Sequence, residues 1–272
     1  MAENEDLSFT ITGTITANKE DDVVFSVQRY LRHFGYLRAG FVAGRLDQQT
    51  EQALINFQRR RQIAVTGEID FATVFELQSP RCGVQDFPRL MLDTDPACIS
   101  FGSDCILRDE NISYYFENFY TAALSQQQVE TEVAAALQKW RYVIRQVRPI
   151  NFSHTHDPSS LFIFGFFEGY HLAGLNDCCI EFDRVLGRLG HAFSPKPCCG
   201  ERAGYCHFDA VEDWRLVTGD GINFRTIALH EIGHLLGLSH SSLKGSLMFE
   251  DYKSMADHLT QDDIDRILTL YS

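Results

Sequence analysis

The feature that most constrains this chain is the segment from His230 to His240, which has histidines at its first, fifth and last positions. Side chains four residues apart on a helix project from the same face, so His230 and His234 can reach one tetrahedral metal ion. Gly237 can end the helix in a left-handed conformation, and the reversal brings His240 round as a third nitrogen ligand. The segment therefore predicts a helix that leads into a three-histidine zinc site.

Three protein ligands leave one zinc position open for water, whose pKa then falls from about 15.7 to roughly 7. Glu231 follows the first ligand and is predicted to be the general base, which takes a proton from this water and passes it to a leaving amine. Met248 fits a methionine turn that supports such a site. A helix can hold two histidines and a glutamate by chance, but the full pattern is far rarer. It predicts peptide hydrolysis.

Composition excludes some classes of function. The 272 residues carry a formal net charge of -13, so nucleic acid and anionic membranes are poor partners. No run of about twenty apolar residues occurs, which predicts no membrane span. The acidic start of the chain lacks the pattern of a signal peptide, so either a signal was trimmed or export is not encoded here.

Other features favour an oxidising, extracellular compartment. The chain has eight cysteines, five of which lie between positions 178 and 206, and such crowding predicts disulfide bonds. N-glycosylation sequons begin at Asn111 and Asn151. We therefore expect a secreted protein.

The chain is expected to comprise an N-terminal segment (1–22), a small helical domain (23–79), a linker (80–111) and a larger domain (112–272). Apolar residues at helical spacing, separated by glycines, predict three short helices in 23–79, and Asp70 is a candidate N-cap. In the larger domain we expect strands at 112–116, 150–152 and 161–167, a loop-rich region at 170–222, and helices at 125–143, 224–236 and 261–271. This alternation predicts an α/β (α+β) domain.

From Val27 to Tyr271 the chain resembles the matrix metalloproteinases, or matrixins, a family of metzincin zinc peptidases. Besides the histidine segment, three motifs carry the resemblance. Pro80–Asp86 is similar to the family's cysteine-switch segment, except that Gln85 stands where proline is usual. The other two are His207–Asp209, followed by Glu212 and Trp214, and the segment Leu259–Ile264.

The resemblance implies a catalytic domain with a twisted mixed sheet, preceded by a three-helix propeptide domain that resembles a peptidoglycan-binding fold. It also implies that Cys82 binds the catalytic zinc in a latent form, because a thiolate in the open position displaces the water that Glu231 needs. Two alternatives remain. Cys82 could be a disulfide partner, and the helical domain could target a wall polymer, although the switch motif argues against the latter.

The family also carries a second, closed zinc site and calcium sites. His171, His191 and His207 fall on the positions of the second zinc, and Asp183, Asp209 and Glu212 on carboxylate positions for calcium. Ala173 replaces the usual aspartate ligand, and the following loop is longer and contains Cys178 and Cys179. Asp177 could supply the fourth ligand, or the cysteines could staple this region in place of the metal. The carboxylates could also be merely solvated.

The implied function is that of a secreted zinc-dependent metalloendopeptidase, made as a latent zymogen, that cleaves extracellular matrix or related proteins. The family's propeller domain is absent, so intact triple-helical collagen is a weak expectation. No furin-type site lies between Cys82 and Ile112, so activation falls to another protease or to self-cleavage. We also expect protein inhibitors as partners, and a monomer.

Two rival interpretations remain. The first is a pseudoenzyme that binds matrix without cutting it, against which the retention of Glu231 and all three ligands speaks. The second is an astacin-like or reprolysin-like metzincin, against which the switch segment and Asp262-Asp263 speak. Gly190, where alanine is usual, and Phe249-Glu250, where Tyr-Pro is usual, are expected to alter the shape of the substrate cleft and not the zinc chemistry.

Overall fold

The structure is a computed structural model that describes residues 9–87, 106–169, 182–183, 185–194, 203–217 and 221–272. It divides into two compact units. Unit 1 comprises Met1–Ser79 and Gln85–Arg89, and unit 2 comprises Pro80–Val84 and Leu90–Ser272. Residues 80–84, which carry the switch cysteine, thus group with the larger unit. The boundaries expected at 79/80 and 111/112 stay predictions.

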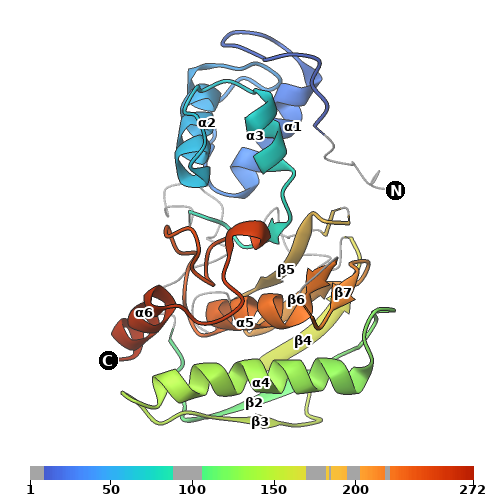
Figure 1. Cartoon of the computed structure of the whole chain (residues 1–272), viewed down its shortest axis with the longest axis vertical. Coiled ribbons are helices and arrows are strands. Elements are labelled where there is room, and N and C mark those ends of the chain that lie inside the picture. The colour runs from blue at the N-terminus through green and yellow to red at the C-terminus, as the bar shows by residue number, and fades with distance from the viewer. Residues whose placement is uncertain (1–8, 88–105, 170–181, 184, 195–202, 218–220) are drawn as a thin grey trace. The chain divides into compact units, whose positions relative to one another are not determined.

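Unit 1 contains the three predicted helices, α1 (Asp22–His33), α2 (Gln48–Arg61) and α3 (Phe71–Leu77) (Figure 1). An aspartate caps each of them, and the predicted cap Asp70 accepts a hydrogen bond from the Thr73 amide at 2.8 Å. Apolar side chains from all three helices form one core. The spacing of apolar residues therefore predicted this unit correctly.

A buried glutamine fixes the loop between α2 and α3. The Gln58 amide nitrogen donates to the Thr66 hydroxyl, the Glu68 carbonyl and the Thr73 hydroxyl, and its oxygen accepts from the amides of Thr66 and Gly67. Gln28 on α1 binds the loop before α2 in the same way, through Val42, Gly44 and Arg45. Two polar side chains thus substitute for apolar packing under two loops.

Unit 2 is built on a six-stranded mixed sheet with the strand order β1-β5-β6-β4-β2-β3. Strand β5 is antiparallel to β6, whereas the other neighbours are parallel. The strands are β1 (Arg81–Cys82), β2 (Asn111–Phe116), β3 (Asn151–His154), β4 (Phe162–Phe167), β5 (Arg188–Ala192) and β6 (Tyr205–Asp209). Strands β7 (Trp214–Arg215) and β8 (Ile222–Asn223) form a separate pair. The predicted mixed sheet is confirmed.

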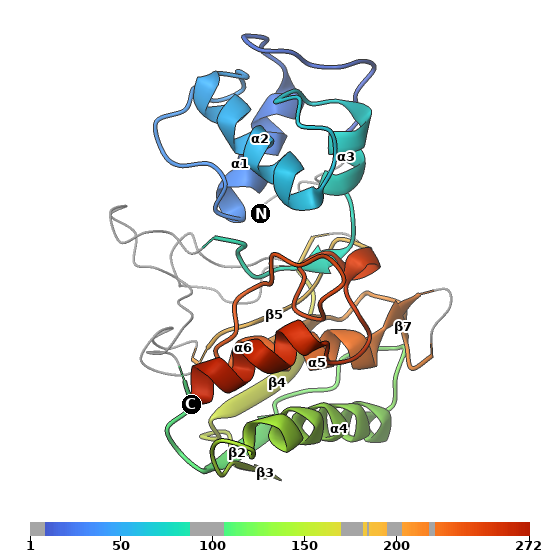
Figure 2. The same ribbon diagram turned by 60° about the vertical axis from the view of Figure 1, so that its left-hand side comes forward.

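Two helices, α4 (Gln126–Ile144) and α5 (Phe224–Leu235), pack against each other and against the sheet (Figures 1 and 2). The indole nitrogen of Trp140 on α4 donates to the Leu229 carbonyl on α5 at 2.9 Å. Arg225 adds a bidentate ion pair with Glu132, at 2.6 and 2.8 Å. These contacts fix the position of helix α5, and with it the positions of the side chains on its other face.

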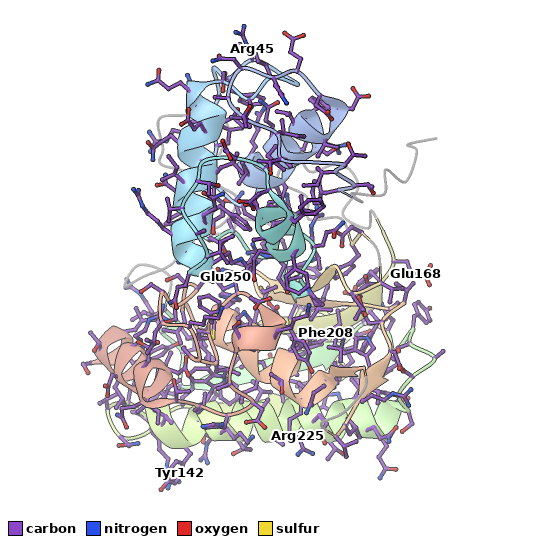
Figure 3. The ribbon with its side chains drawn as sticks, turned by 45° about the horizontal axis from the view of Figure 1, so that its top comes forward. Arg45, Tyr142, Glu168, Phe208, Arg225 and Glu250 are labelled. Carbon is purple, nitrogen blue, oxygen red and sulfur yellow. The ribbon has the colours of Figure 1, made fainter. Side chains whose placement is uncertain are left out.

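The helices cover the face of the sheet that carries the buried aromatic side chains of β4 and β6, including Phe164, Phe166 and Phe208. Figure 3 labels Phe208 among the side chains of this unit. Side chains alternate along a strand, so Gly165 and His207 point to the opposite face. After α5 come the 3-10 helix η3 (Tyr252–Ser254) and α6 (Gln261–Tyr271), which begins after Thr260 as predicted. The sheet thus has one face packed under helices and a second face available for loops.

The expectation of a loop-rich region over 170–222 is wrong in part. Strands β5, β6 and β7 lie within this range, although 170–181 and several shorter stretches fall outside the described residues. These strands are short, and β5 and β6 carry the histidines that interrupt an apolar pattern. The two strands are stabilised by their pairing with each other, which their own sequences do not indicate.

None of the helices in the described part of the chain has the length and apolar character needed to cross a membrane.

Replacement of Gln58 with alanine is expected to weaken unit 1. The change leaves the amides of Thr66 and Gly67 without their acceptor, which costs about 2–4 kcal/mol. Hydrogen exchange of α2 and α3 amides measures this loss. Gln52→Ala, on the exposed side of the same helix, serves as the control and should change the free energy of opening by less than about 0.5 kcal/mol. Equal effects of the two substitutions would contradict the prediction.

Candidate metal centre

Helix α5 carries His230 and His234 one turn apart, with both rings buried. The Nδ1 atom of His230 lies 2.7 Å from the Leu247 carbonyl oxygen, and Nδ1 of His234 lies 2.7 Å from the Leu238 carbonyl oxygen. A carbonyl only accepts, so both Nδ1 atoms carry the proton. Both Nε2 atoms are then unprotonated lone-pair donors.

These two Nε2 atoms lie only 3.1 Å apart. Two lone pairs at this distance repel unless a cation lies beside them, so the arrangement fits a metal ion. Gly237 has a φ of 96°, and the Leu238 amide donates to the Gly233 carbonyl, which turns the chain back as predicted. This reversal brings the His240 ring to 4.7 Å from the His234 ring, measured between centroids.

The electrostatics of the site suit neutral ligands. Burial lowers the pKa of His230 to about 4 and that of His234 well below its usual value, with His240 and His230 as further causes for the latter. Metal binding requires deprotonated imidazole nitrogens. The site is therefore preorganised to accept a cation without first releasing protons from these two rings.

Glu231 lies on α5 between the two histidines and is completely buried. Burial raises the pKa of its carboxyl group to about 8, and the neighbouring Cys82 thiol, which can donate to the carboxylate, opposes this rise. A β-carbon at Gly190 would lie 3.3 Å from Glu231 Oε1 and 3.2 Å from the His207 carbonyl oxygen. Gly190 therefore leaves room for a carboxylate with the raised pKa expected of a general base near neutral pH.

Cys82 joins the three histidines. One ligand atom from each of Cys82, His230, His234 and His240 fits within a span of 4.8 Å, and all four residues are buried. The Cys82 sulfur lies 3.5 Å from His234 Nε2 and accepts the Val84 amide at 3.3 Å. Burial and the neighbouring Glu231 raise the thiol pKa well above its ordinary value. Cys82 is a free thiol, which excludes the disulfide alternative for this residue.

The segment around Cys82 lies between two other segments of unit 2. On one side β1 pairs with β5, and the Gly83 amide donates to the Gly190 carbonyl at 2.7 Å. On the other side the Cys82 amide donates to the Glu250 carbonyl, and the Tyr252 amide to the Pro80 carbonyl. Residues 80–84 therefore lie as an extended strand along the metal centre.

Met248 lies against the metal-binding helix. It is fully buried, and a β-carbon at Gly233 would lie 2.4 Å from its sulfur, so only glycine permits this approach. The turn before it is held by Asp263 on α6, which accepts from the Ser246 hydroxyl and the amides of Leu247 and Met248. Leu247 in turn supplies the carbonyl that orients His230. Sequence reasoning gave Asp263 no role; the signal was the capping pattern from Thr260 to Asp263.

The structure describes two of the three histidines of the predicted second zinc site. His191 on β5 and His207 on β6 are opposite each other, and His191 Nε2 lies 3.3 Å from His207 Nδ1. Both rings are buried, and burial lowers the pKa of His207. His171, Ala173, Asp177, Cys178 and Cys179 lie outside the described residues. The two described histidines therefore fit a shared metal ion.

The predicted calcium ligands gather next to this site. Asp209 is fully buried, and its Oδ2 has no donor among the described residues. Burial raises its pKa to about 7, and the charges of Glu212, Asp183 and Glu168 add to the rise. The Leu186 amide donates to Glu212, and the Arg188 amide to Asp183. Carboxylates crowded at a buried position fit a cation with oxygen ligands better than simple solvation.

The cysteine-rich region departs from expectation at one residue. Cys206, on the helix-covered face of β6, is a buried free thiol and not a disulfide partner. Cys178, Cys179, Cys198 and Cys199 lie outside the described residues. A strand position that faces the aromatic core explains the burial of Cys206 as packing.

Comparison with known proteins shows a match to the matrixin family model over residues 106–272 and to the peptidoglycan binding domain model over residues 20–76. The metalloendoproteinase 1-MMP of Arabidopsis thaliana is 31% identical over 265 residues, which cover 91% of this chain and 68% of that protein. Interstitial collagenase of Sus scrofa is 31% identical over 94% of this chain and 51% of its own length. The chain thus spans two thirds of the plant enzyme and about half of the collagenase.

Replacement of Asp263 with alanine is expected to lower the free energy of unfolding by about 3–5 kcal/mol, because five hydrogen bonds to a buried carboxylate are lost. Burial alone would raise the pKa of Asp263, but hydrogen bonds from Ser246 and Thr260 lower it below 3.8. A lowered carboxyl pKa contributes stability above the unfolded value, and that stability is lost as the pH falls through the folded value. The difference between variant and parent should shrink below pH 3.8 in urea unfolding.

The exposed Asp265→Ala on the same helix is the control for this prediction. It should change stability by less than about 0.5 kcal/mol at any pH. A difference between Asp263→Ala and the parent that does not depend on pH would contradict the role given to the carboxylate.

Proposed function

Because this chain belongs to the matrixin family and is a metalloendopeptidase, we propose that His230, His234 and His240 hold its catalytic zinc and that Glu231 is its general base. The observation that carries this proposal is the pair of Nε2 atoms 3.1 Å apart, each aimed by a hydrogen bond from the opposite ring nitrogen. Two neutral imidazoles have no other reason to be oriented in this way.

A bound zinc ion supplies Lewis acidity toward a peptide carbonyl and toward water. The residues of the chain do the rest. Glu231 is adjacent to the first ligand, and once the Cys82 thiol leaves it is positioned to accept a proton from the attacking water and deliver it to the leaving nitrogen. Its burial holds the pKa near 8, which favours proton delivery close to neutral pH.

We assign the Cys82 segment to latency. The sulfur is directed at the histidine cluster, and β1 occupies the space between β5 and the Glu250–Tyr252 segment. A substrate strand that pairs with the edge of β5 needs this position. Cys82 therefore blocks the metal and its segment blocks the substrate, so activity requires displacement of residues 80–84. Cleavage of the chain beyond Cys82, by another protease or by self-cleavage, provides that displacement.

The second metal site and the calcium site belong to the same proposal. His191 and His207, joined by His171, hold a closed zinc that serves structure. Asp183, Asp209 and Glu212 contribute to a calcium site beside it. Both sites join loops to strands β5 and β6, which border the substrate position. Asp177 is the candidate for the fourth ligand of this zinc, and the alternative is that the neighbouring cysteines staple the region in place of the metal.

We further propose that the protein is secreted and cleaves extracellular matrix or related extracellular proteins. The two sequons and the number of cysteines support an extracellular location. The substrate class is inferred from a relative that is named interstitial collagenase. Protein inhibitors that occupy the same cleft are expected partners.

Substitution of Glu231 by alanine tests the catalytic assignment. We expect kcat/KM for a quenched fluorescent peptide to fall by a factor of about 10²–10⁴, because the general base is lost. Zinc content measured by mass spectrometry should not change, since Glu231 is not a ligand. Glu130→Ala, on helix α4, is the control and should retain full activity. Both proteins are assayed after treatment with a thiol-modifying mercurial. Activity retained by Glu231→Ala would remove Glu231 from the mechanism, and zinc bound without activity in the treated parent would support the pseudoenzyme.

Substitution of Cys82 by alanine tests latency. The purified parent should be inactive until a thiol-modifying mercurial is added, whereas Cys82→Ala, which loses the thiolate ligand that holds residues 80–84 at the metal, should release this segment and cleave the peptide without treatment. A zinc chelator should abolish activity in both. Cys206→Ala removes the other described buried thiol, which faces the sheet core, and should stay latent. A parent that is active before treatment would contradict the latch and leave the peptidase assignment intact.

A further inference from the structure

A row of polar residues crosses the face of the sheet opposite to helices α4 and α5. His191 on β5 is opposite His207 on β6, and His207 is in turn opposite Gly165 on β4. Glu117 follows directly after Phe116, which pairs with Phe164, and its amide donates to the Phe164 carbonyl. Four adjacent strands therefore place Glu117, Gly165, His207 and His191 side by side.

Glu117 contacts Nε2 of His207, the ring nitrogen that faces away from His191. Its Oε1 lies 3.2 Å from His207 Nε2, whereas His207 Nδ1 lies 3.3 Å from His191 Nε2. The two nitrogens of an imidazole point in divergent directions. Glu117 is thus on the wrong side of the ring to bind the ion that the two histidines share.

Gly165 makes this contact possible. A β-carbon at this position would lie 2.8 Å from the ring of Phe167 and 2.9 Å from both Cγ and Oε1 of Glu117, so any larger residue would displace both side chains. The side chain of Glu117 reaches over β4 through the space that the glycine leaves.

The surroundings strengthen the interaction. The side chain of His207 is 1% exposed, and the ring of Phe167 lies 4.6 Å from it between centroids. The ring of Phe182 stacks on His191 at 5.0 Å. A carboxylate that approaches a buried ring between aromatic side chains is screened less than one on an open surface.

From this geometry we infer that Glu117 is the positioning residue of the second zinc site. Its carboxylate, 3.2 Å from His207 Nε2, is placed to accept the Nε2 proton when Nδ1 binds an ion, which would fix the tautomer in which Nδ1 carries the free lone pair and orient the ring toward His191. A carboxylate behind a ligating histidine raises its basicity and usually contributes 10- to 100-fold in metal affinity, as a rough guide. The inference rests on the second zinc site of the proposed function and extends it to a residue outside the ligand set.

The test compares zinc retention in the full-length protein. Zinc per chain is measured by mass spectrometry, and zinc transfer to a chromogenic chelator gives the affinity of each ion. The parent should hold two ions. Glu117→Leu should weaken one of them roughly 10- to 100-fold, and Glu117→Gln, which keeps an acceptor oxygen, should weaken it less. His191→Ala identifies the affected ion, because it should release the same one.

Two further variants separate positioning from a general structural effect. Gly165→Ala should weaken the same ion by displacing Glu117, and its effect on that ion should be smaller in the Glu117→Leu background, where only the displacement of Phe167 remains. Glu110→Leu, an exposed glutamate just before the same strand, should leave both ions unchanged. The ring N–H resonance of His207 in the NMR spectrum should move upfield in Glu117→Leu and partly return in Glu117→Gln.

Two results would overturn the inference. One is a Glu117→Leu protein that holds both zinc ions as tightly as the parent, and the other is a parent that holds only one zinc. Peptide cleavage, measured on separate portions of the same samples after treatment with a thiol-modifying mercurial, keeps the outcomes apart. Unchanged zinc retention in an active enzyme refutes only the role of Glu117, whereas a protein that binds zinc without cleaving peptide refutes the proposed catalytic function.

Discussion

The structure of unit 2 depends on the two hydrogen bonds that fix the proton on Nδ1 of His230 and His234. They are made to backbone carbonyls, one at the end of the helix reversal and one in the turn before Met248. Both acceptors are themselves positioned by other elements, Leu238 by the turn at Gly237 and Leu247 by Asp263 of α6. The ligands are therefore aimed by the folding of segments that do not contact the metal ion. This arrangement explains why many of the buried polar side chains belong to the segment after α5.

The functional side chains of strand β5 and its neighbours lie on two different faces of the sheet. Gly190 points to the helix-covered face, where it approaches Glu231, and the next residue, His191, points to the opposite face. Strand β5 thus borders both candidate metal sites through consecutive residues. A closed metal site behind the cleft is a reason for β5 to remain rigid when residues 80–84 leave.

Much of this organisation could be predicted from the sequence, for identifiable reasons. Helices α4, α5 and α6 have long apolar periodicity and side-chain caps, and the histidine segment has a spacing that only a helix and a reversal satisfy. Strands β5 and β6 could not be predicted. Each has only five residues, and a buried histidine in each strand interrupts the alternation of apolar and polar residues. The role of Asp263 could not be predicted either. The sequence indicates an aspartate that caps α6, but it does not indicate that the same side chain also holds the turn before Met248. Glu117 is an extreme case, because its partner is ninety residues away and the link runs through a glycine that contributes only space.

The departures from the usual family pattern acquire a physical meaning in this light. Gly190 replaces alanine at a point where a β-carbon would crowd both Glu231 and the backbone of β6, at 3.3 and 3.2 Å. The smaller residue therefore gives the general base more freedom on the side of β5, the strand that also borders the second zinc. A carboxylate behind His207 and a vacant side-chain position at Gly165 act on the other face of the same pair of strands. The two faces differ in chemistry but share the same device: a glycine on one strand makes room for a glutamate from another element.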